Sequence, residues 1–210
     1  MTATRPDLSY IVTKLSQYMS KPTMCHLNMV RRVFHYLKAT RDYSLVFRKV
    51  RGDLSLIGVS DSDWGSSPGD RRSTTGYCFK LSDEGPIISW KSRKQQTVAL
   101  STCEAEYMAA SAAVQEAKFL LQLLSDFRVL EIQSSLLYVD NQGTLALAKN
   151  PVQHQRSKHI DIRYHFIRNE VLSGTIKLAY IPTDLNLADI FTKGVPRPRL
   201  EKLSKLILNT

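Results

Sequence analysis

Long apolar runs, paired cysteines and a leader-like start are missing from this chain of 210 residues. Because no run of about 18 apolar residues occurs, we expect no membrane-spanning helix. The three cysteines, Cys25, Cys78 and Cys103, are odd in number and lack CxxC spacing, which favours free thiols over a disulfide framework or a zinc site. The start has an early acid and no apolar block, so it does not resemble a signal peptide. We therefore expect an intracellular protein, in a cytoplasmic particle or the nucleus, and not a secreted one.

Several common catalytic signatures are also missing. The chain contains no GxSxG, no GxxxxGK[ST] and no HExxH. These absences leave no basis for a serine hydrolase of the nucleophile-elbow type, a P-loop nucleotide triphosphatase or a zinc protease. Chemistry in this chain has to come from other side chains, and carboxylates are the strongest candidates.

The net charge of +10 is unevenly distributed. Residues 1–50 carry nine basic and two acidic side chains, residues 51–150 carry ten and twelve, and residues 151–210 carry ten and five. An acidic middle between two basic flanks is typical of a metal site surrounded by surfaces that bind a polyanion. A basic balance alone is weak evidence, because many solvated surfaces are basic.

The first fifty residues have a helical pattern. Leu8, Ile11, Val12 and Leu15 recur at helical spacing, and Pro22 ends that helix because proline removes a backbone donor. A second helix is predicted over 26–38, with an apolar stripe of Leu27, Val30, Val33, Phe34 and Leu37. Two short helices form a poor core of their own, so this segment is expected to pack on the rest of the chain.

The rest of the chain predicts an α/β fold. The period of two indicates strands, the period of 3.6 indicates helices, and Gly- and Pro-rich stretches separate them. Three strands with short links, then a long helix, then alternation of strand and helix, predict a mixed sheet with helices on both faces. Strands are predicted over 44–49, 54–60, 75–81, 87–91, 135–139 and 175–181, and helices over 101–127, 142–149, 156–172 and 185–193.

Four acids stand out, each inside a short motif of its own. They are Asp61 in VSDSDWG, Glu106 in STCEAEYMA, Asp140 in LYVDNQG and Asp189 in LNLADIFTK. Asp61 and Asp140 are expected to end strands, while the other two lie near helix starts. Mg²⁺ prefers oxygen ligands, so acids gathered at strand ends suit a two-metal phosphodiester-cleaving site. Taken singly, each acid is better explained as an ordinary surface residue, but the order, local hydrophobic context and spacing of the whole set favour a common site.

The motifs together resemble the ribonuclease H domain of Ty1/copia-type retrotransposon Pol polyproteins. The resemblance runs through GVSDSDWG, DRRSTTGYCFKL, ISWKSRKQQTVALSTCEAEYMAASAA, LYVDNQGTLALAKNP, RSKHIDIRYHFIRNEV and YIPTDLNLADIFTKG. Residues 5–45 resemble the segment that follows the polymerase palm in the same polyproteins. Together, these two resemblances imply a helical remnant of the reverse transcriptase over 1–45, a ribonuclease H-like five-stranded domain over 51–195 and a C-terminal tail over 196–210. The Y-x-D-D motif of the polymerase is absent, so no DNA synthesis is expected.

The resemblance implies a Mg²⁺-dependent endonuclease that cleaves the RNA strand of RNA–DNA hybrids. Asp61, Glu106, Asp140 and Asp189 would hold two Mg²⁺ ions, which Mn²⁺ could replace, and the reverse transcriptase portion of the polyprotein would be a partner. Cellular ribonucleases H carry a histidine shortly before the last aspartate. This chain has no histidine at that place, and copia-type domains also lack it. A silent nucleic-acid-binding fragment of a decayed or repurposed element is the alternative, and an integrase-type transferase is a weaker one.

Substrate contacts are expected from two groups of residues. By resemblance, Gln142 would touch the minor groove of the hybrid, while Ser101 and Thr102 would hold the DNA strand; helix capping is an equally good interpretation of these three. The basic residues of the predicted helix over 156–172 could follow a phosphate backbone. They are Arg156, Lys158, Arg163 and Arg168. Two further acids lie beside the four. Glu104 is expected to cap the start of the long helix, and Asp63 is expected to be solvated.

Overall fold

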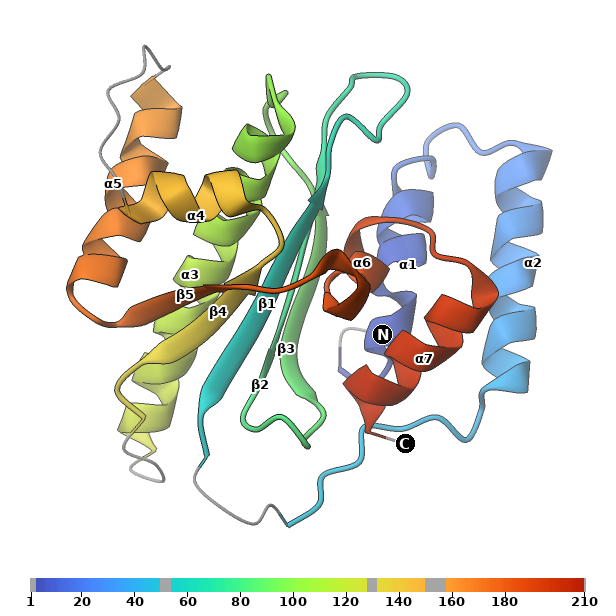
Figure 1. The fold of residues 1–210 in the computed structure, drawn as a ribbon. Helices are drawn as coiled ribbons and strands as arrows, with labels where there is room; N and C mark the ends of the chain where they lie inside the picture. Colours follow the sequence, from blue (N-terminus) through green and yellow to red (C-terminus); the bar gives the residue numbers. More distant parts are fainter. Residues whose placement is uncertain (1–2, 50–53, 128–131, 150–157, 210) are drawn as a thin grey trace.

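A five-stranded mixed sheet forms the centre of the computed structural model, which describes residues 3–49, 54–127, 132–149 and 158–209. The strand order is β3-β2-β1-β4-β5, with β1, β2 and β3 antiparallel and β1, β4 and β5 parallel (Figure 1). This arrangement confirms the predicted fold class. The strands are β1 (Leu56–Asp63), β2 (Thr74–Lys80), β3 (Ile87–Lys94), β4 (Ser135–Val139) and β5 (Ile176–Tyr180).

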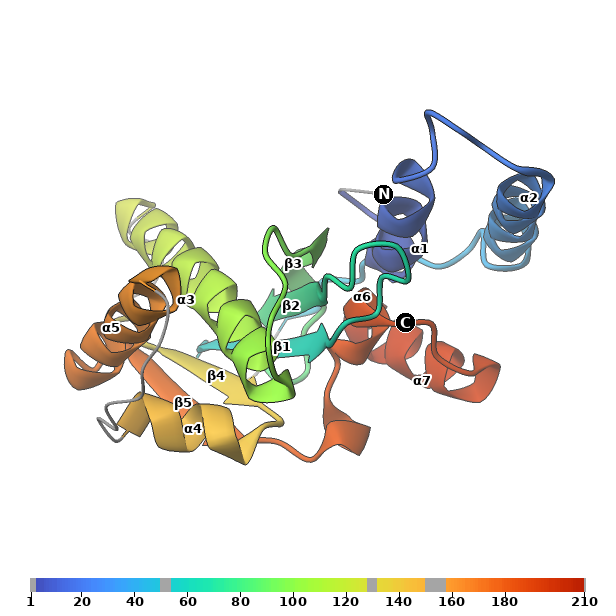
Figure 2. The same cartoon turned by 90° about the horizontal axis from the view of Figure 1, so that it is seen from above.

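Helices cover both faces of the sheet, as the view from above shows (Figure 2). One face carries α3 (Thr102–Asp126), α4 (Gln142–Lys149) and α5 (Lys158–Leu172), and the other carries α6 (Asp189–Thr192) and α7 (Arg197–Leu208). Successive side chains of a strand point to opposite faces. On β2, Tyr77 and Phe79 therefore join the core under α3, while Cys78 joins the core under α6 and α7.

The long helix α3 begins with the cap that the sequence predicts. Oγ of Ser101 accepts a hydrogen bond from the backbone N–H of Glu104 at 3.1 Å. Oε2 of Glu104 in turn accepts one from the backbone N–H of Leu100 at 2.8 Å. Two backbone donors at the helix start are satisfied by side chains, which fixes where the helix begins. Glu106 then lies in the second turn, on the buried side of the helix.

The predicted strand over 44–49 is wrong. These described residues form no strand and lie along the end of α7 instead. Val46 donates its backbone N–H to the carbonyl of Leu208 at 2.9 Å, and its own carbonyl accepts a hydrogen bond from Nδ2 of Asn209 at 3.1 Å. Periodicity predicted a strand here, but it does not reveal that the hydrogen-bond partner of Val46 is the end of a helix.

The stretch over 196–210, expected as a tail, contains the helix α7. Leu203, Ile207 and Leu208 of α7 are buried in the core under β1 and β2. Pro198 lies in the first turn, where proline is well tolerated because the missing N–H has no helical partner there. The leucine and isoleucine spacing of a helix was present in the sequence. The helix matters for the site because it delivers Arg199.

The N-terminal segment forms η1 (Pro6–Leu8), α1 (Ser9–Ser16) and α2 (Met24–Ala39). Leu8 is buried, and Oγ1 of Thr13 donates to the carbonyl of Ser92 on β3 at 3.2 Å, so this end of the segment packs on the sheet domain. By contrast, none of the sixteen described residues of α2 is buried. No described helix is long and apolar enough to cross a membrane.

The apolar stripe of α2 lines an open groove against α1. The groove has a volume of about 580 Å³, and Leu27 and Phe34 in it are 43% and 66% exposed. The expectation that the N-terminal segment packs on the rest of the chain therefore does not extend to the apolar stripe of α2. The helix packs by one side on α1 and leaves the stripe accessible, because the amphipathic period fixes which residues share a face but not what covers that face.

Candidate active site

Three of the four predicted acids come together at one end of the sheet. Asp61 lies on β1, Asp140 directly follows β4, and Glu106 projects from α3. Strands β1 and β4 are parallel neighbours, with Ser60 opposite Val139, so the next residue of each strand lies beside the other. One carboxylate oxygen from each of the three acids lies within 4.8 Å of the others. Asp61 is two residues short of the strand end, since β1 continues to Asp63.

The side chain of Glu106 is held from one side only. Its Oε1 accepts hydrogen bonds from the backbone N–H and from Oγ of Ser62, at 3.1 and 3.0 Å. Its Oε2 is buried and accepts no hydrogen bond from the described residues. A buried carboxylate oxygen without a partner is costly, and a cation is the partner that fits it best. The donor set, all carboxylate oxygens, suits a hard divalent ion.

The electrostatics of the cluster also fit a cation. Burial raises the pKa of Asp61 to about 7, with Asp189 and Asp140 adding to the rise, while Lys193 and Thr192 oppose it. Burial, followed by the charges of Asp61 and Asp140, raises the pKa of Glu106 well above its usual value. Buried carboxylates that repel one another in this way are typical of sites that bind metal ions or exchange protons.

The fourth acid, Asp189, lies beside this cluster and already has two cationic partners. Nζ of Lys193 is 2.7 Å from Oδ1 of Asp189, and the guanidinium of Arg199 donates to Oδ2. Lys193 also lies 3.9 Å from Oδ2 of Asp61, and the hydroxyl of Thr192 donates to that same oxygen. Burial by itself would lower the pKa of Lys193, but Asp61, Asp189 and, to a smaller extent, Asp63 raise it above its ordinary value.

Sequence reasoning missed Thr192, Lys193 and Arg199. Lys193 follows Asp189 by four residues, which is the spacing of an ion pair on a helix, so its role could have been read from the sequence. Arg199 could not, because it depends on how α7 packs.

A glycine lets α6 reach the acids. Gly76 on β2 pairs with Asp61 on β1. A Cβ atom added at Gly76 would lie 2.6 Å from Cγ2 of Thr192 and 2.8 Å from Cβ of Phe191. Such distances are too short for any side chain, so only glycine allows α6 to lie this close to the sheet. The close approach places Asp189 and Lys193 next to Asp61.

The predicted hybrid-contacting residues lie around this end of the sheet. Ser101 and Thr102 are exposed at the start of α3, and Gln142 is exposed as the first residue of α4. Ser101 serves as a helix cap, while Asn141 rather than Gln142 accepts the backbone N–H of Thr144 at 3.0 Å.

The basic residues predicted on α5 are only partly described. Arg163 and Arg168 are partly exposed on that helix. Arg156 lies outside the described residues, as does the side chain of Lys158.

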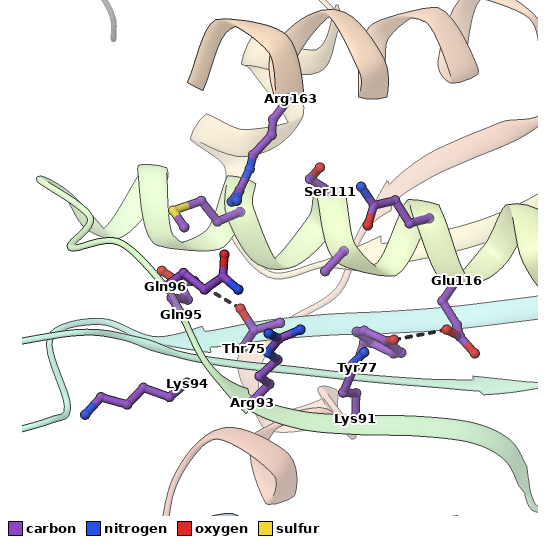
Figure 3. A pocket seen from close by; sticks show the side chains of 13 residues that line it. Thr75, Tyr77, Lys91, Arg93, Lys94, Gln95, Gln96, Ser111, Glu116 and Arg163 are labelled. Carbon is purple, nitrogen blue, oxygen red and sulfur yellow. Dashed lines mark hydrogen bonds between the residues drawn. The ribbon is translucent and has the colours of Figure 1, made fainter. Parts of the chain in front are cut away.

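A basic pocket of about 350 Å³ lies between β3 and α3 (Figure 3). Its basic lining residues are Lys91, Arg93 and Lys94 from β3 and Arg163 from α5, and one acid, Glu116, lies at the other end. Gln95 also lines the pocket, and its Nε2 donates to Oγ1 of Thr75 and to the carbonyl of Ala105, both at 3.0 Å. Ala105 precedes Glu106, so the pocket and the acidic cluster share one stretch of α3.

The chain is similar to several known proteins, although no family model matches it. It is 41% identical over 204 residues to a retrovirus-related Pol polyprotein from transposon RE2 of Arabidopsis thaliana, covering 97% of this chain and 14% of that protein. It is 49% identical over 120 residues to the secreted RxLR effector protein 161 of Plasmopara viticola, covering 57% of this chain and 82% of that protein. The chain thus spans a small part of the length of its Pol polyprotein relative.

Among solved structures, the foamy viral protease-reverse transcriptase in complex with dsDNA aligns with a TM-score of 0.52 at 14% identity. The alignment covers 86% of this chain and 35% of that chain, and it supports the fold alone. The five-stranded mixed sheet with helices on both faces agrees with the ribonuclease H-like fold predicted from the motifs. Over nearly its full length the chain matches a segment of the Pol polyproteins of copia-type retrotransposons, which confirms the resemblance predicted from the motifs.

Proposed function

We propose that this domain cleaves the RNA strand of RNA–DNA hybrids in a reaction that requires Mg²⁺. The observation that carries the proposal is the cluster of Asp61, Glu106 and Asp140, with carboxylate oxygens within 4.8 Å of one another. The buried, unpartnered Oε2 of Glu106 supports a cation at this position. Similarity to a segment of the Pol polyproteins supports a hybrid as the substrate, since reverse transcription produces one.

The three acids would hold the metal, and nearby residues would fix their positions. When bound, Mg²⁺ would lower the pKa of an attacking water and stabilise charge on the leaving 3′ oxygen. Ser62 holds Oε1 of Glu106 with two hydrogen bonds, which fixes the carboxylate and leaves Oε2 free of hydrogen bonds from the described residues. Asn186 donates Nδ2 to the carbonyl of Ser60 at 3.1 Å, which ties the loop before α6 to β1.

Basic side chains outside the acidic centre would bind the phosphates of the hybrid. The pocket with Lys91, Arg93, Lys94 and Arg163 offers several cations within reach of one phosphate backbone. Contacts to phosphates give affinity without sequence preference. Selection of the RNA strand would come from contacts to 2′-hydroxyls, which DNA lacks. Gln142 is exposed for its predicted contact with the minor groove, and Ser101 and Thr102 are exposed for their predicted contacts with the DNA strand.

The test is a gel assay with a hybrid labelled in turn on each strand. We expect Mg²⁺-dependent shortening of the labelled RNA, no cleavage of the labelled DNA, and no cleavage of the RNA alone. The RNA fragments should carry a 5′-phosphate and a 3′-hydroxyl, which ligation would detect. Chelation of the metal should stop the reaction. Intact RNA at saturating Mg²⁺ would contradict the proposal.

The alternative, a silent nucleic-acid-binding fragment, has one observation in its favour. A similar segment makes up most of a relative described as a secreted effector, whose name does not mention a polymerase. Against it, the three clustered acids are all present in this chain. Hybrid binding without cleavage in the gel assay would favour the alternative.

A further inference from the structure

Asp189 is neutralised within the protein itself. Its side chain is 2% exposed, with Lys193 2.7 Å from Oδ1 and Arg199 donating to Oδ2. Both carboxylate oxygens therefore face a cationic side chain. A divalent ion that used Asp189 as a ligand would have to replace one of these partners, because a buried carboxylate oxygen cannot serve an ammonium group and a metal ion equally well.

Lys193 lies between the fourth acid and the other three. Its Nζ is 2.7 Å from Asp189 and 3.9 Å from Oδ2 of Asp61, and Asp61 belongs to the cluster with Glu106 and Asp140. The ammonium group thus occupies the side of Asp61 that faces Asp189. This is where a second cation, shared by these two aspartates, would have to lie.

The charges support a single divalent ion beside Lys193. With all four acids ionised, the centre carries four negative charges, and Lys193 and Arg199 supply two positive charges. Two negative charges remain, which one divalent ion balances. With a neutral residue at position 193, three would remain. Charges this close interact strongly when they are shielded from water, so one unit of charge is enough to alter ion affinity.

Of the two cations, Lys193 is the one that can move. Arg199 is anchored elsewhere as well, since its Nη2 donates to the carbonyl of Thr183 at 2.8 Å and its Nη1 lies 3.5 Å from Asp184. Lys193 is the C-cap residue of the four-residue helix α6, and its side chain is 37% exposed. A lysine ammonium is a point charge on a flexible stem, so it can leave an ion pair without disturbing the backbone.

We propose that Lys193 is a resident counter-cation of the active site that limits the protein to one tightly bound divalent ion. The ion is held by Asp61, Glu106 and Asp140, and Lys193 holds the position between Asp61 and Asp189. A second ion binds there only when Lys193 is displaced. The inference rests on the proposed function, since it assumes that the acidic cluster binds metal.

The experiment counts Mn²⁺ ions bound to the full chain, by electron paramagnetic resonance of free Mn²⁺ and by calorimetry. The native chain should bind one ion, and a second at least about tenfold more weakly. Lys193→Met removes the charge and keeps the length of the side chain, and it should tighten the second ion about tenfold. Lys193→Arg keeps the charge and should retain the native pattern. Lys118→Met is the matched control, because Lys118 pairs with Glu170 at 2.5 Å away from the site.

Thermal unfolding gives a second measurement that does not depend on activity. Metal-free Lys193→Met should melt below the native chain, and saturating Mn²⁺ should close that gap, whereas any gap for Lys118→Met should persist. Lys193→Gln, which keeps a donor for Asp189, serves where the methionine variant does not fold. Native and Lys193→Met proteins with the same second-ion affinity would overturn the inference and leave the proposed function intact. A native chain that binds no Mn²⁺ would overturn both.

Discussion

Ser62 donates two hydrogen bonds to one oxygen of Glu106, from its backbone N–H at 3.1 Å and from its Oγ at 3.0 Å. The pair joins β1 to α3 across the buried end of the sheet. Because both bonds go to Oε1, Oε2 is left for another partner. The orientation of this carboxylate, and with it the shape of the proposed metal site, depends on a serine one position after Asp61.

Removing the hydroxyl of Ser62 should therefore weaken metal binding. Ser62→Ala keeps the backbone hydrogen bond and deletes the other, so we expect Mn²⁺ affinity and cleavage to fall about tenfold, as is typical for residues that orient a metal ligand. Calorimetry and the hybrid gel assay measure the two effects. Ser60→Ala is the matched control, since Ser60 is buried on the same strand and its Oγ has no described partner. Equal losses in both variants would contradict this role of Ser62.

Asp140→Asn should abolish most cleavage and leave hybrid binding similar or slightly tighter. The change deletes a proposed metal ligand and removes a negative charge near the phosphate, so a loss of about a hundredfold or more in rate is expected. Asp63→Asn should have a much smaller effect, because Asp63 ends β1 outside the three-acid cluster. Rates from the gel assay and affinities from fluorescence anisotropy test this pair. Equal loss in both variants would mean that Asp63 also takes part.

The metal-free protein should lose stability as pH rises from about 4 to 7. Burial raises the pKa of Asp61 from 3.8 to about 7, so the folded chain binds more protons than the unfolded chain across this window. The free energy of unfolding then falls with pH, by at most about 1.4 kcal/mol per pH unit for one proton. Denaturant titrations at several pH values measure the slope. Asp61→Asn should flatten it, and a slope of the opposite sign would contradict the assignment.

Arg93 and Arg163 should bind phosphates of the hybrid. Both line the basic pocket, from β3 and α5 (Figure 3). Replacing both by alanine should weaken binding of hybrids of any sequence and lower the log–log salt slope by about 0.9 for each phosphate that is no longer bound. Arg41→Ala is the control, because Arg41 is exposed in the turn after α2 and pairs only with Asp42 among the described residues. An unchanged salt slope in the double variant would exclude the pocket from the binding path.

Replacing apolar side chains in the groove between α1 and α2 with polar ones should improve the solubility of the protein and leave it folded. Leu27→Ser and Phe34→Ser act on side chains that are 43% and 66% exposed, so we expect stability changes within about 0.5 kcal/mol. Light scattering should show less self-association, because an exposed apolar patch promotes it. Leu8→Ser is the contrasting variant, since Leu8 is 2% exposed and its replacement should destabilise the fold. A large loss of stability from Phe34→Ser would show that the groove is closed in solution.

Local signals in the sequence were sufficient for most of the sheet domain. The strand over 135–139 and the helix over 142–149 agree with β4 and α4 at both ends. The cap at Ser101 and Glu104 placed the start of α3 within one residue. These features are local, since a period of two, a period of 3.6 or a capping pattern is set by neighbouring residues. Where the partner was distant in sequence, as for 44–49 against α7, the same reasoning failed.

The sequence by itself determined the acids, their order along the chain and the secondary-structure elements that carry them. Only the tertiary structure decided which of them meet. Asp61 and Asp140 are neighbours because β1 and β4 pair in parallel, and Glu106 joins them because Ser62 of β1 binds it. Asp189 differs from these three acids because it forms ion pairs with Lys193 and with Arg199 of α7. Sequence spacing fixes the face that a residue occupies, whereas charge balance at a site depends on every element that packs against it.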